Sequence, residues 1–272
     1  MRLTYGALMQ AILSRKSVRR YRDECVDASL RQALLEVDGL RRLNIAQCRV
    51  EYIESPESLD HVFTGIIGSY GKIRGARAAL CLITPSHEKK AGQMEAGYLG
   101  EQYVLRAAAL GLGTCWVGGT FDYKKLMGHC SIGPDEKVAA LIALGWPAED
   151  KDKLRNMLHS MVRHKEMPAI ASKNLLGGPQ WLTTAIHAAG RAPSAINLQP
   201  WFFSGTPERV ELKASRNGAF TSIDLGIAML HFEAVILAYG HSGKWEFDKG
   251  IPTISVQPTE APQAQRINFV DM

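Results

Sequence analysis

Hydrophobic residues recur along this chain in two patterns, one with the period of a helix and one typical of short buried strands. Helical spacing predicts helices at residues 4–13, 27–43, 92–110, 180–190 and 224–240. Apolar runs of strand length predict strands at 48–53, 77–83, 114–119, 137–145, around Phe202, around Val210, and at 244–248 and 253–257. Because strands and helices interleave irregularly, the pattern predicts an α+β fold.

Two parts of the chain resemble each other. A shift of 129 residues places Gly97 on Gly226 and Trp116 on Trp245, and a shift of 152 places Gln47 on Gln199. Chance similarity between two amphipathic helices is the alternative explanation. Duplication predicts two halves, and the charged run at 150–166 divides them into residues 1–165 and a shorter second half, 166–272.

Composition narrows the class of protein. The net charge of +5 is too small to indicate a nucleic-acid-binding protein by itself. The longest apolar candidate, 138–148, is shorter than a membrane span, and the amino end lacks the order of a secretory signal, so we expect a cytoplasmic protein without a membrane partner. The five cysteines are widely spaced and the histidines show no paired ligand spacing, so we expect free thiols and no metal site.

A basic segment, SRKSVRRYR at residues 14–22, follows the first predicted helix. Arginine side chains bind phosphate oxygens in pairs and keep their charge when partly buried, so Arg15, Lys16 and Arg19, with the Ser17 hydroxyl, could hold a phosphate. A solvated basic face, or a patch that binds nucleic acid nonspecifically, would have the same composition.

A second stretch, PSAINLQPW at residues 193–201, lies far along the chain. Pro193 and Ser194 can expose backbone N–H groups at a turn, and the amides of Asn197 and Gln199 offer donors and acceptors that suit a planar heterocycle. A capped helix followed by an ordinary turn is the alternative.

Three other features are weak when taken singly. Gly118 and Gly119 could let backbone approach a flat ring closely, although GLGTCWVGG runs from helix into strand and is not a dinucleotide fingerprint. The basic residues Lys72, Lys153 and Arg155 each lie beside a predicted strand.

Taken together, these motifs resemble the nitroreductase family of FMN-dependent flavoenzymes. The resemblance is carried by RKSVRRY, GLGTCWVGG, GWPAEDKDKLR, APSAINLQPW and DLGIAM, which span nearly the whole chain. Members are usually interlocked α+β homodimers with two FMN sites at the interface. Here each flavin motif occurs once, with RRLNIAQCRV standing where the first half would carry the second motif. The resemblance therefore implies a single-chain pseudo-dimer with one composite FMN site, and such a chain needs no partner chain, so we expect a monomer.

The resemblance also implies a role for each candidate residue. Arg15, Lys16, Ser17 and Arg19 would bind the FMN phosphate, ribityl chain and ring edge, and Lys153 and Arg155 would also meet the phosphate. Pro193, Ser194, Asn197 and Gln199 would line the ring from the other half. Gly118 and Gly119 would lie near N5, and Lys72 near N1, where a cation stabilises reduced flavin.

The implied activity is transfer of hydride from NADH or NADPH through FMN to a small acceptor such as a nitroaromatic or quinone. No catalytic side chain can be singled out. A nonenzymatic FMN-binding sensor is one alternative, and a basic nucleic-acid binder using residues 15–22 is another.

Overall fold

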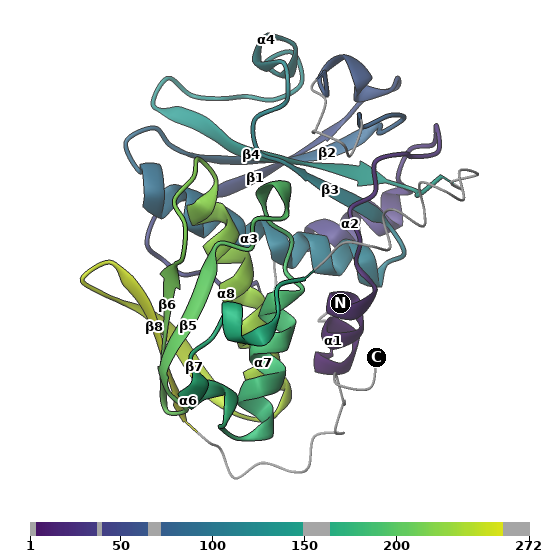
Figure 1. Ribbon diagram of the computed structural model, residues 1–272. Helices are drawn as coiled ribbons and strands as arrows, with labels where there is room; N and C mark the ends of the chain where they lie inside the picture. Colours follow the sequence, from purple (N-terminus) through teal and green to yellow (C-terminus); the bar gives the residue numbers. More distant parts are fainter. Residues whose placement is uncertain (1–3, 37–39, 65–71, 149–163, 258–272) are drawn as a thin grey trace.

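The computed structural model describes residues 4–36, 40–64, 72–148 and 164–257, and its elements form two sheets packed around a central group of helices (Figure 1). Both sheets are antiparallel throughout their described strands. The expected α+β class with two pseudo-symmetric halves is confirmed.

The first sheet has the strand order β1-β2-β4-β3. Its strands are β1 (Arg49–Glu54), β2 (Ala78–Pro85), β3 (Gly113–Val117) and β4 (Glu136–Gly145). The two central strands, β2 and β4, are apolar on both faces, as buried strands must be when helices cover one side and loops the other. The edge strand β3 is therefore the place where another segment can pair.

The second sheet repeats this order as β5-β6-β8-β7. Its strands are β5 (Trp201–Thr206), β6 (Arg209–Ala214), β7 (Ser242–Asp248) and β8 (Ile251–Gln257). A shift of 152 residues carries β1 onto β5 from end to end, and a shift of 129 carries Gly113, where β3 begins, onto Ser242, where β7 begins. The repeat read from the sequence therefore coincides with a repeat of the structure.

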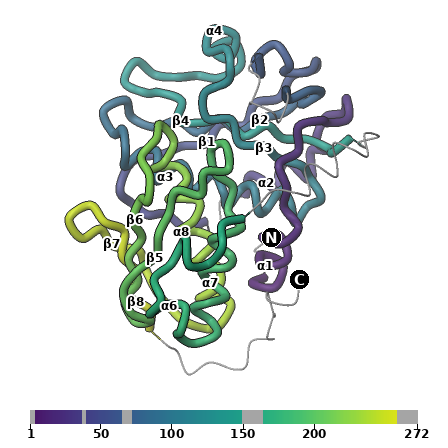
Figure 2. Tube along the Cα trace, viewed as in Figure 1, coloured from purple at the N-terminus to yellow at the C-terminus, as the bar shows by residue number. Residues whose placement is uncertain are grey.

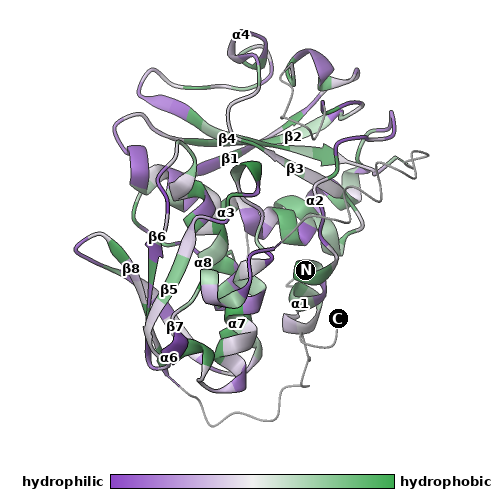
Figure 3. Ribbon diagram, in the orientation of Figure 1, coloured by the Kyte–Doolittle hydropathy of each residue, from purple (hydrophilic) through white to green (hydrophobic). Residues whose placement is uncertain are grey.

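The helices of the described residues are of two kinds. The α-helices are α1 (Tyr5–Ser14), α2 (Ala28–Leu35), α3 (Lys89–Ala109), α4 (Tyr123–Leu126), α6 (Lys173–Leu176), α7 (Gln180–Gly190) and α8 (Thr221–Ala238). Short 3-10 helices are η1 (Leu59–His61), η3 (Met167–Ala169) and η4 (Ala195–Asn197). The long helices and the inner faces of the sheets carry most of the hydrophobic residues (Figure 3).

The two longest helices cross where each carries a glycine. A Cβ atom on Gly97 would collide with the Ile223 carbonyl, and one on Gly226 would collide with the Met94 carbonyl. Gly97 and Gly226 are the pair that the 129-residue shift superposes, so the crossing of α3 and α8 lies between the halves. Helix α8, with 18 residues, is long and apolar enough to cross a membrane. However, 89% of this helix is buried inside the protein, as expected of a core helix.

One helix is shorter than predicted. The pattern from 27 to 43 predicts a single helix, whereas α2 ends at Leu35 and residues 40–48 form an irregular turn. The Glu95 carboxylate accepts the N–H groups of Leu43 and Ile45 at 3.1 and 3.3 Å, and Asn44 adopts a positive φ of 59°. Tertiary hydrogen bonds therefore override the local helical pattern here.

Candidate functional site

The basic segment runs along the free edge of the first sheet. Val18 N–H donates to the Thr114 carbonyl of β3 at 2.8 Å, and Ser17 forms a parallel bridge with the same residue. The approach is close, because a Cβ atom on Gly113 would lie 2.8 Å from Val18. The glycine at the start of β3 thus lets the arginine-rich backbone pair with the sheet.

Further hydrogen bonds hold the rest of this segment. Arg74 N–H donates to the Arg19 carbonyl and Tyr21 N–H donates to the Arg74 carbonyl, both at 2.9 Å. Lys72 is exposed and lies two positions before Arg74 in the chain, so its backbone is near the basic segment. Lys153 and Arg155 lie outside the described residues, and their predicted contact with phosphate stays a prediction.

Arg15 is surrounded by charged groups from both halves of the chain. Burial lowers the pKa of Arg15, the nearby carboxylate of Glu101 raises it, and the positive charges of Arg191 and Arg19 lower it further. Arg191 directly follows α7 in the second half and belongs to no motif that the sequence singled out. The Arg15 Nε atom is buried and has no hydrogen-bond partner among the residues that the structure describes. We call Arg15, Arg19 and Arg191 the arginine cluster.

His164 adds a further basic group from the end of the first half. Its Nδ1 lies 2.9 Å from the Gly190 carbonyl. Partial burial lowers the pKa of His164, and the charges of Arg191 and Arg15 lower it as well. His164 and the arginine cluster therefore lie in one basic region. Arg15 contributes to this region from the first half and Arg191 from the second.

Glu101, the carboxylate that acts on Arg15, is fully buried and already engaged. It accepts a hydrogen bond from Trp116 Nε1 at 2.8 Å and lies 2.9 Å from His231 Nε2. His231, also fully buried, has its Nδ1 3.0 Å from the Ala188 carbonyl. A carboxylate that is shared in this way is a weakened counter-ion for Arg15, so a bound anion would be stabilised beside that guanidinium group.

The turn between α7 and β5 has an unusual backbone, and Figure 2 shows it as the green connection that rises from α7. Three of its residues that are not glycine adopt positive φ, namely Ile196 at 46°, Asn197 at 57° and Gln199 at 45°. Each such residue costs on the order of 1–2 kcal/mol, and such strain persists where surrounding contacts impose it, often at ligand sites.

Two hydrogen bonds impose this turn. Ala195 N–H donates to Asp224 Oδ1 at 3.0 Å, and Gln199 N–H donates to Ser194 Oγ at 2.9 Å. Burial raises the pKa of Asp224 to about 7, with the Ala195 N–H acting in the opposite direction. The carboxyl group of the DLG motif on α8 thus anchors the turn that carries Pro193, Ser194 and Asn197.

Gln199 faces into the turn itself. Its side chain is 1% exposed, its Oε1 accepts Lys165 N–H at 2.8 Å, and its Nε2 donates to Asn197 Oδ1 at 3.2 Å. These bonds orient Asn197. By contrast, Ile196 at the tip of the turn is 66% exposed.

Gly118 and Gly119 lie against an aromatic ring from the second half. A Cβ atom on Gly118 would lie 2.7 Å from the ring of Phe220, and one on Gly119 would lie 3.1 Å from it. Phe220 directly precedes α8 and was not predicted from the sequence. The space beside the glycine pair is thus taken in part by Phe220, and the expected approach of this backbone to a flavin ring stays a prediction.

The equivalent place in the other half is closed. Arg41, from the first-half turn, forms an ion pair with the buried carboxylate of Glu233, which also accepts the Tyr98 hydroxyl at 2.7 Å. Arg41 reaches the Gly243 carbonyl as well, at 3.4 Å. Gly243 corresponds, by the 129-residue shift, to the Thr114 whose carbonyl accepts Val18. The Arg41 side chain thus contacts β7 at the position that corresponds to the place on β3 where the basic segment pairs.

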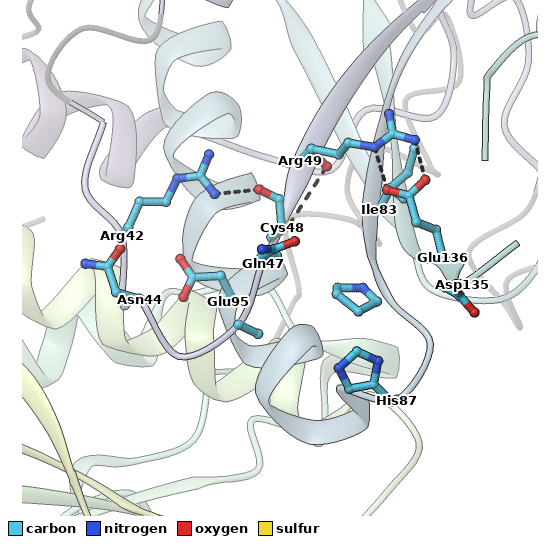
Figure 4. Close-up of a pocket in the computed structure, with 12 residues that line it drawn as sticks. Arg42, Asn44, Gln47, Cys48, Arg49, Ile83, His87, Glu95, Asp135 and Glu136 are labelled. Carbon is cyan, nitrogen blue, oxygen red and sulfur yellow. Dashed lines mark hydrogen bonds and ion pairs between the residues drawn. The ribbon is translucent and has the colours of Figure 1, made fainter. Parts of the chain in front are cut away.

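A cavity of about 610 Å³ opens beside this first-half turn (Figure 4). Arg42 donates to the Cys48 carbonyl at 2.5 Å, and Arg49 binds Glu136 at 2.8 and 2.7 Å. Arg49 and Glu136 on its wall are thus paired with each other, and its lining among the described residues includes none of the predicted site residues.

Comparisons with known proteins bear on the family and the fold. The family model described as "Putative TM nitroreductase" matches residues 7–236. A Thermotoga maritima crystal structure with the same kind of description aligns over 94% of this chain and 95% of its own, with a TM-score of 0.63 and 18% identity. Identity at that level shows a shared fold. No curated protein matches the sequence.

Two smaller structures were solved with bound FMN. The Desulfovibrio desulfuricans protein is 24% identical, covering 55% of this chain and 94% of its own with a TM-score of 0.40. The Desulfitobacterium hafniense protein is 16% identical, covering 56% of this chain and 97% of its own with a TM-score of 0.43.

Proposed function

This chain belongs to the nitroreductase family, and on that premise we propose that it is an FMN-dependent oxidoreductase with one flavin site formed by both halves of a single chain. The observation that carries the proposal is the arginine cluster, in which Arg191 of the second half adds its charge to that of Arg15 and Arg19.

The residues present fit an FMN phosphate. A phosphate monoester is a dianion with several acceptor oxygens, and the buried Nε of Arg15 has no hydrogen-bond partner within the described ranges of the chain. Arg15, Arg19 and Arg191 would hold this group, with Lys16 and Ser17 beside them. The carboxylate that acts on Arg15, Glu101, is already shared with Trp116 and His231, which supports the assignment.

The strained turn would face the flavin ring. Asn197 is oriented by Gln199, which makes Gln199 a positioning residue in this proposal. The Oγ atom of Ser194 accepts the Gln199 N–H, so its own O–H can donate to a ligand. Pro193 would line the ring beside these groups.

Bound FMN would supply the hydride transfer itself. The chain's own contribution is to bind and orient. Lys72 would place a cation near the pyrimidine end of the ring, and Gly118 and Gly119 would offer backbone N–H groups. Hydride would come from NADH or NADPH and would pass to a small aromatic acceptor.

We also propose that the protein is a monomer in the cytoplasm and binds neither membrane nor nucleic acid. The division of the chain at residue 165 stays a prediction.

The experiment is reconstitution with FMN followed by anaerobic mixing with NADH and with NADPH. Loss of the yellow absorbance with either nucleotide is the expected result. Protein that binds FMN and is reduced by neither would instead be a flavin-binding sensor. Protein that is colourless once the excess FMN has been removed would overturn the proposal.

A further inference from the structure

Two histidines that are 68 residues apart in the sequence meet on the surface of the first half. His61 ends η1, and His129 lies in the turn after α4. Their Nε2 atoms are 3.1 Å apart and their ring centroids 5.3 Å apart. Each neutral imidazole ring has one N–H group and one nitrogen with a lone pair, so two ring nitrogens this close share one proton or one electrophile.

The orientation of the His61 ring is set by the backbone. Its Nδ1 lies 3.3 Å from the Ser58 carbonyl, which can only accept, so Nδ1 carries the proton and Nε2 carries the lone pair. A histidine that donates Nδ1–H to a carbonyl and presents Nε2 is arranged as metal-binding histidines are. In the neutral pair, His129 Nε2–H donates to His61.

The segments that carry the two rings are fixed to each other. Asp122 N–H donates to the Val62 carbonyl at 2.8 Å, directly joining the η1 segment to the start of α4. Val62 and Leu126 are both buried in the same hydrophobic cluster. Asp60 Oδ1 also accepts Gly75 N–H at 2.7 Å. The backbone segments that carry the rings are therefore already ordered, so binding of an ion by both rings would cost little further backbone entropy.

We propose that His61 and His129 bind a divalent transition ion of the class of Zn²⁺, Ni²⁺ and Cu²⁺. An ion about 2.0–2.1 Å from two nitrogens that are 3.1 Å apart would make an N–metal–N angle of roughly 95–100°, which is close to the cis angle of these ions. The centroid distance of 5.3 Å shows that the two rings now point almost straight at each other, so each ring would tilt toward the ion on binding. Binding needs the His129 proton to move from Nε2 to Nδ1, and it involves no change of oxidation state.

The ligand set fixes the class of ion. Imidazole nitrogens suit these metals, whereas Mg²⁺ and Ca²⁺ prefer oxygen ligands. In the part of the chain that the structure describes, no group of three or more histidine, cysteine or carboxylate ligands gathers around an ion. Water would therefore complete the coordination, and the ion would exchange with solvent. The distance between positions 61 and 129 explains why ligand spacing in the sequence gave no sign of this site.

Calorimetric titration of the purified full chain with Ni²⁺, after treatment with EDTA, tests the proposal. We expect one equivalent to bind, with affinity reduced roughly tenfold or more by His61→Gln and equally by His129→Gln. His87→Gln is the matched control, since the His87 side chain is 77% exposed and outside the pair, and it should leave binding unchanged.

Ni²⁺ binding that persists in both variants, or no binding by the unaltered protein, would overturn the proposal and leave the pair as a hydrogen bond alone. Thermal unfolding of the metal-free variants shows whether each is folded. Mg²⁺ in place of Ni²⁺ should give no heat from this site.

Discussion

Glu95 on α3 and Asp224 on α8 do the same thing in the two halves. Glu95 accepts the N–H of Leu43 at 3.1 Å, and Asp224 accepts the N–H of Ala195 at 3.0 Å. The 129-residue shift superposes the two acids, and the 152-residue shift superposes the two donors. Each half thus holds its turn with a carboxyl group from its long helix, although only the second turn carries the Pro-Ser-Asn motif.

Asp224 makes stability depend on pH. Its folded pKa of about 7 lies above the ordinary value of 3.8, so the folded state binds the proton more tightly. This contribution is present below pH 4 and is lost as pH rises toward 7, by an amount on the order of 4 kcal/mol at most. Asp224→Asn keeps the acceptor for Ala195 N–H and should flatten this part of the profile. Denaturant unfolding between pH 4 and 8 measures it; an unchanged slope in the variant would contradict the assignment.

The strain at Ile196 should be removable. Its counterpart by the 152-residue shift is Asn44, and asparagine tolerates positive φ better than a β-branched residue does. Because Ile196 is 66% exposed, Ile196→Asn loses little packing and should raise the free energy of unfolding by about 1 kcal/mol. Unfolding of the FMN-free protein is the measurement. A destabilised variant would mean that the isoleucine packs against something essential.

The helix crossing should tolerate no added methyl group at its glycines. Gly226→Ala would push a Cβ atom into the Met94 carbonyl and should cost about 3 kcal/mol or more in stability. Gly6→Ala is the control, because nothing lies within 4 Å of that position and alanine favours helix. Thermal unfolding should therefore move in opposite directions for the two variants. Equal tolerance of both would refute the close contact of α3 with α8.

Phosphate recognition by both halves can be tested through the arginines. Arg15→Ala and Arg191→Ala should each weaken FMN binding roughly 10–100-fold, the worth of a charge-assisted hydrogen bond, and should change riboflavin binding much less. Arg20→Ala is the control from the same basic segment, since its side chain is exposed. Fluorescence titration gives all the constants. A variant at Arg191 that binds FMN as well as the unaltered protein does would remove the second half from the phosphate site.

Local pattern predicted much of this fold because burial leaves a strong periodic signal. The strands β2 and β4 are continuous apolar runs, and α7 was predicted to its exact limits at 180 and 190. The pattern failed at 36 and at 40–43, and hydrogen bonds to Glu95, distant in sequence, fix the backbone at Leu43 and Ile45. Short elements such as η1 and α4 were missed, since a single helical turn has no period to detect.

The site was harder to predict than the fold. Motifs in the sequence indicated Arg15 and the 193–199 turn, because arginine forks and paired amides have few uses in a loop. Arg191 and Phe220 gave no such signal, since an arginine after a helix is ordinary and an aromatic residue before one reads as core. Their importance comes from neighbours brought in by the other half of the chain, which no local pattern contains.

The second half-site should not bind flavin. Arg41 is paired with Glu233 and contacts Gly243 of β7. This position corresponds to the place on β3 where the basic segment pairs in the first half. Arg41→Ala would leave the buried Glu233 carboxylate without its counter-ion, so we expect a loss of stability of about 3 kcal/mol, with no second FMN bound. Denaturant unfolding and flavin absorbance per chain are the two readouts. A second equivalent of FMN in this variant would show that the ion pair alone closes the site.

The central claim is that one chain uses both of its halves to hold one FMN. Native mass spectrometry of the full chain after reconstitution with excess FMN tests this most directly, because it counts chains and flavins in the same particle. The account predicts a single chain carrying one FMN. Two flavins on one chain, or flavin found only on particles of two chains, would contradict it.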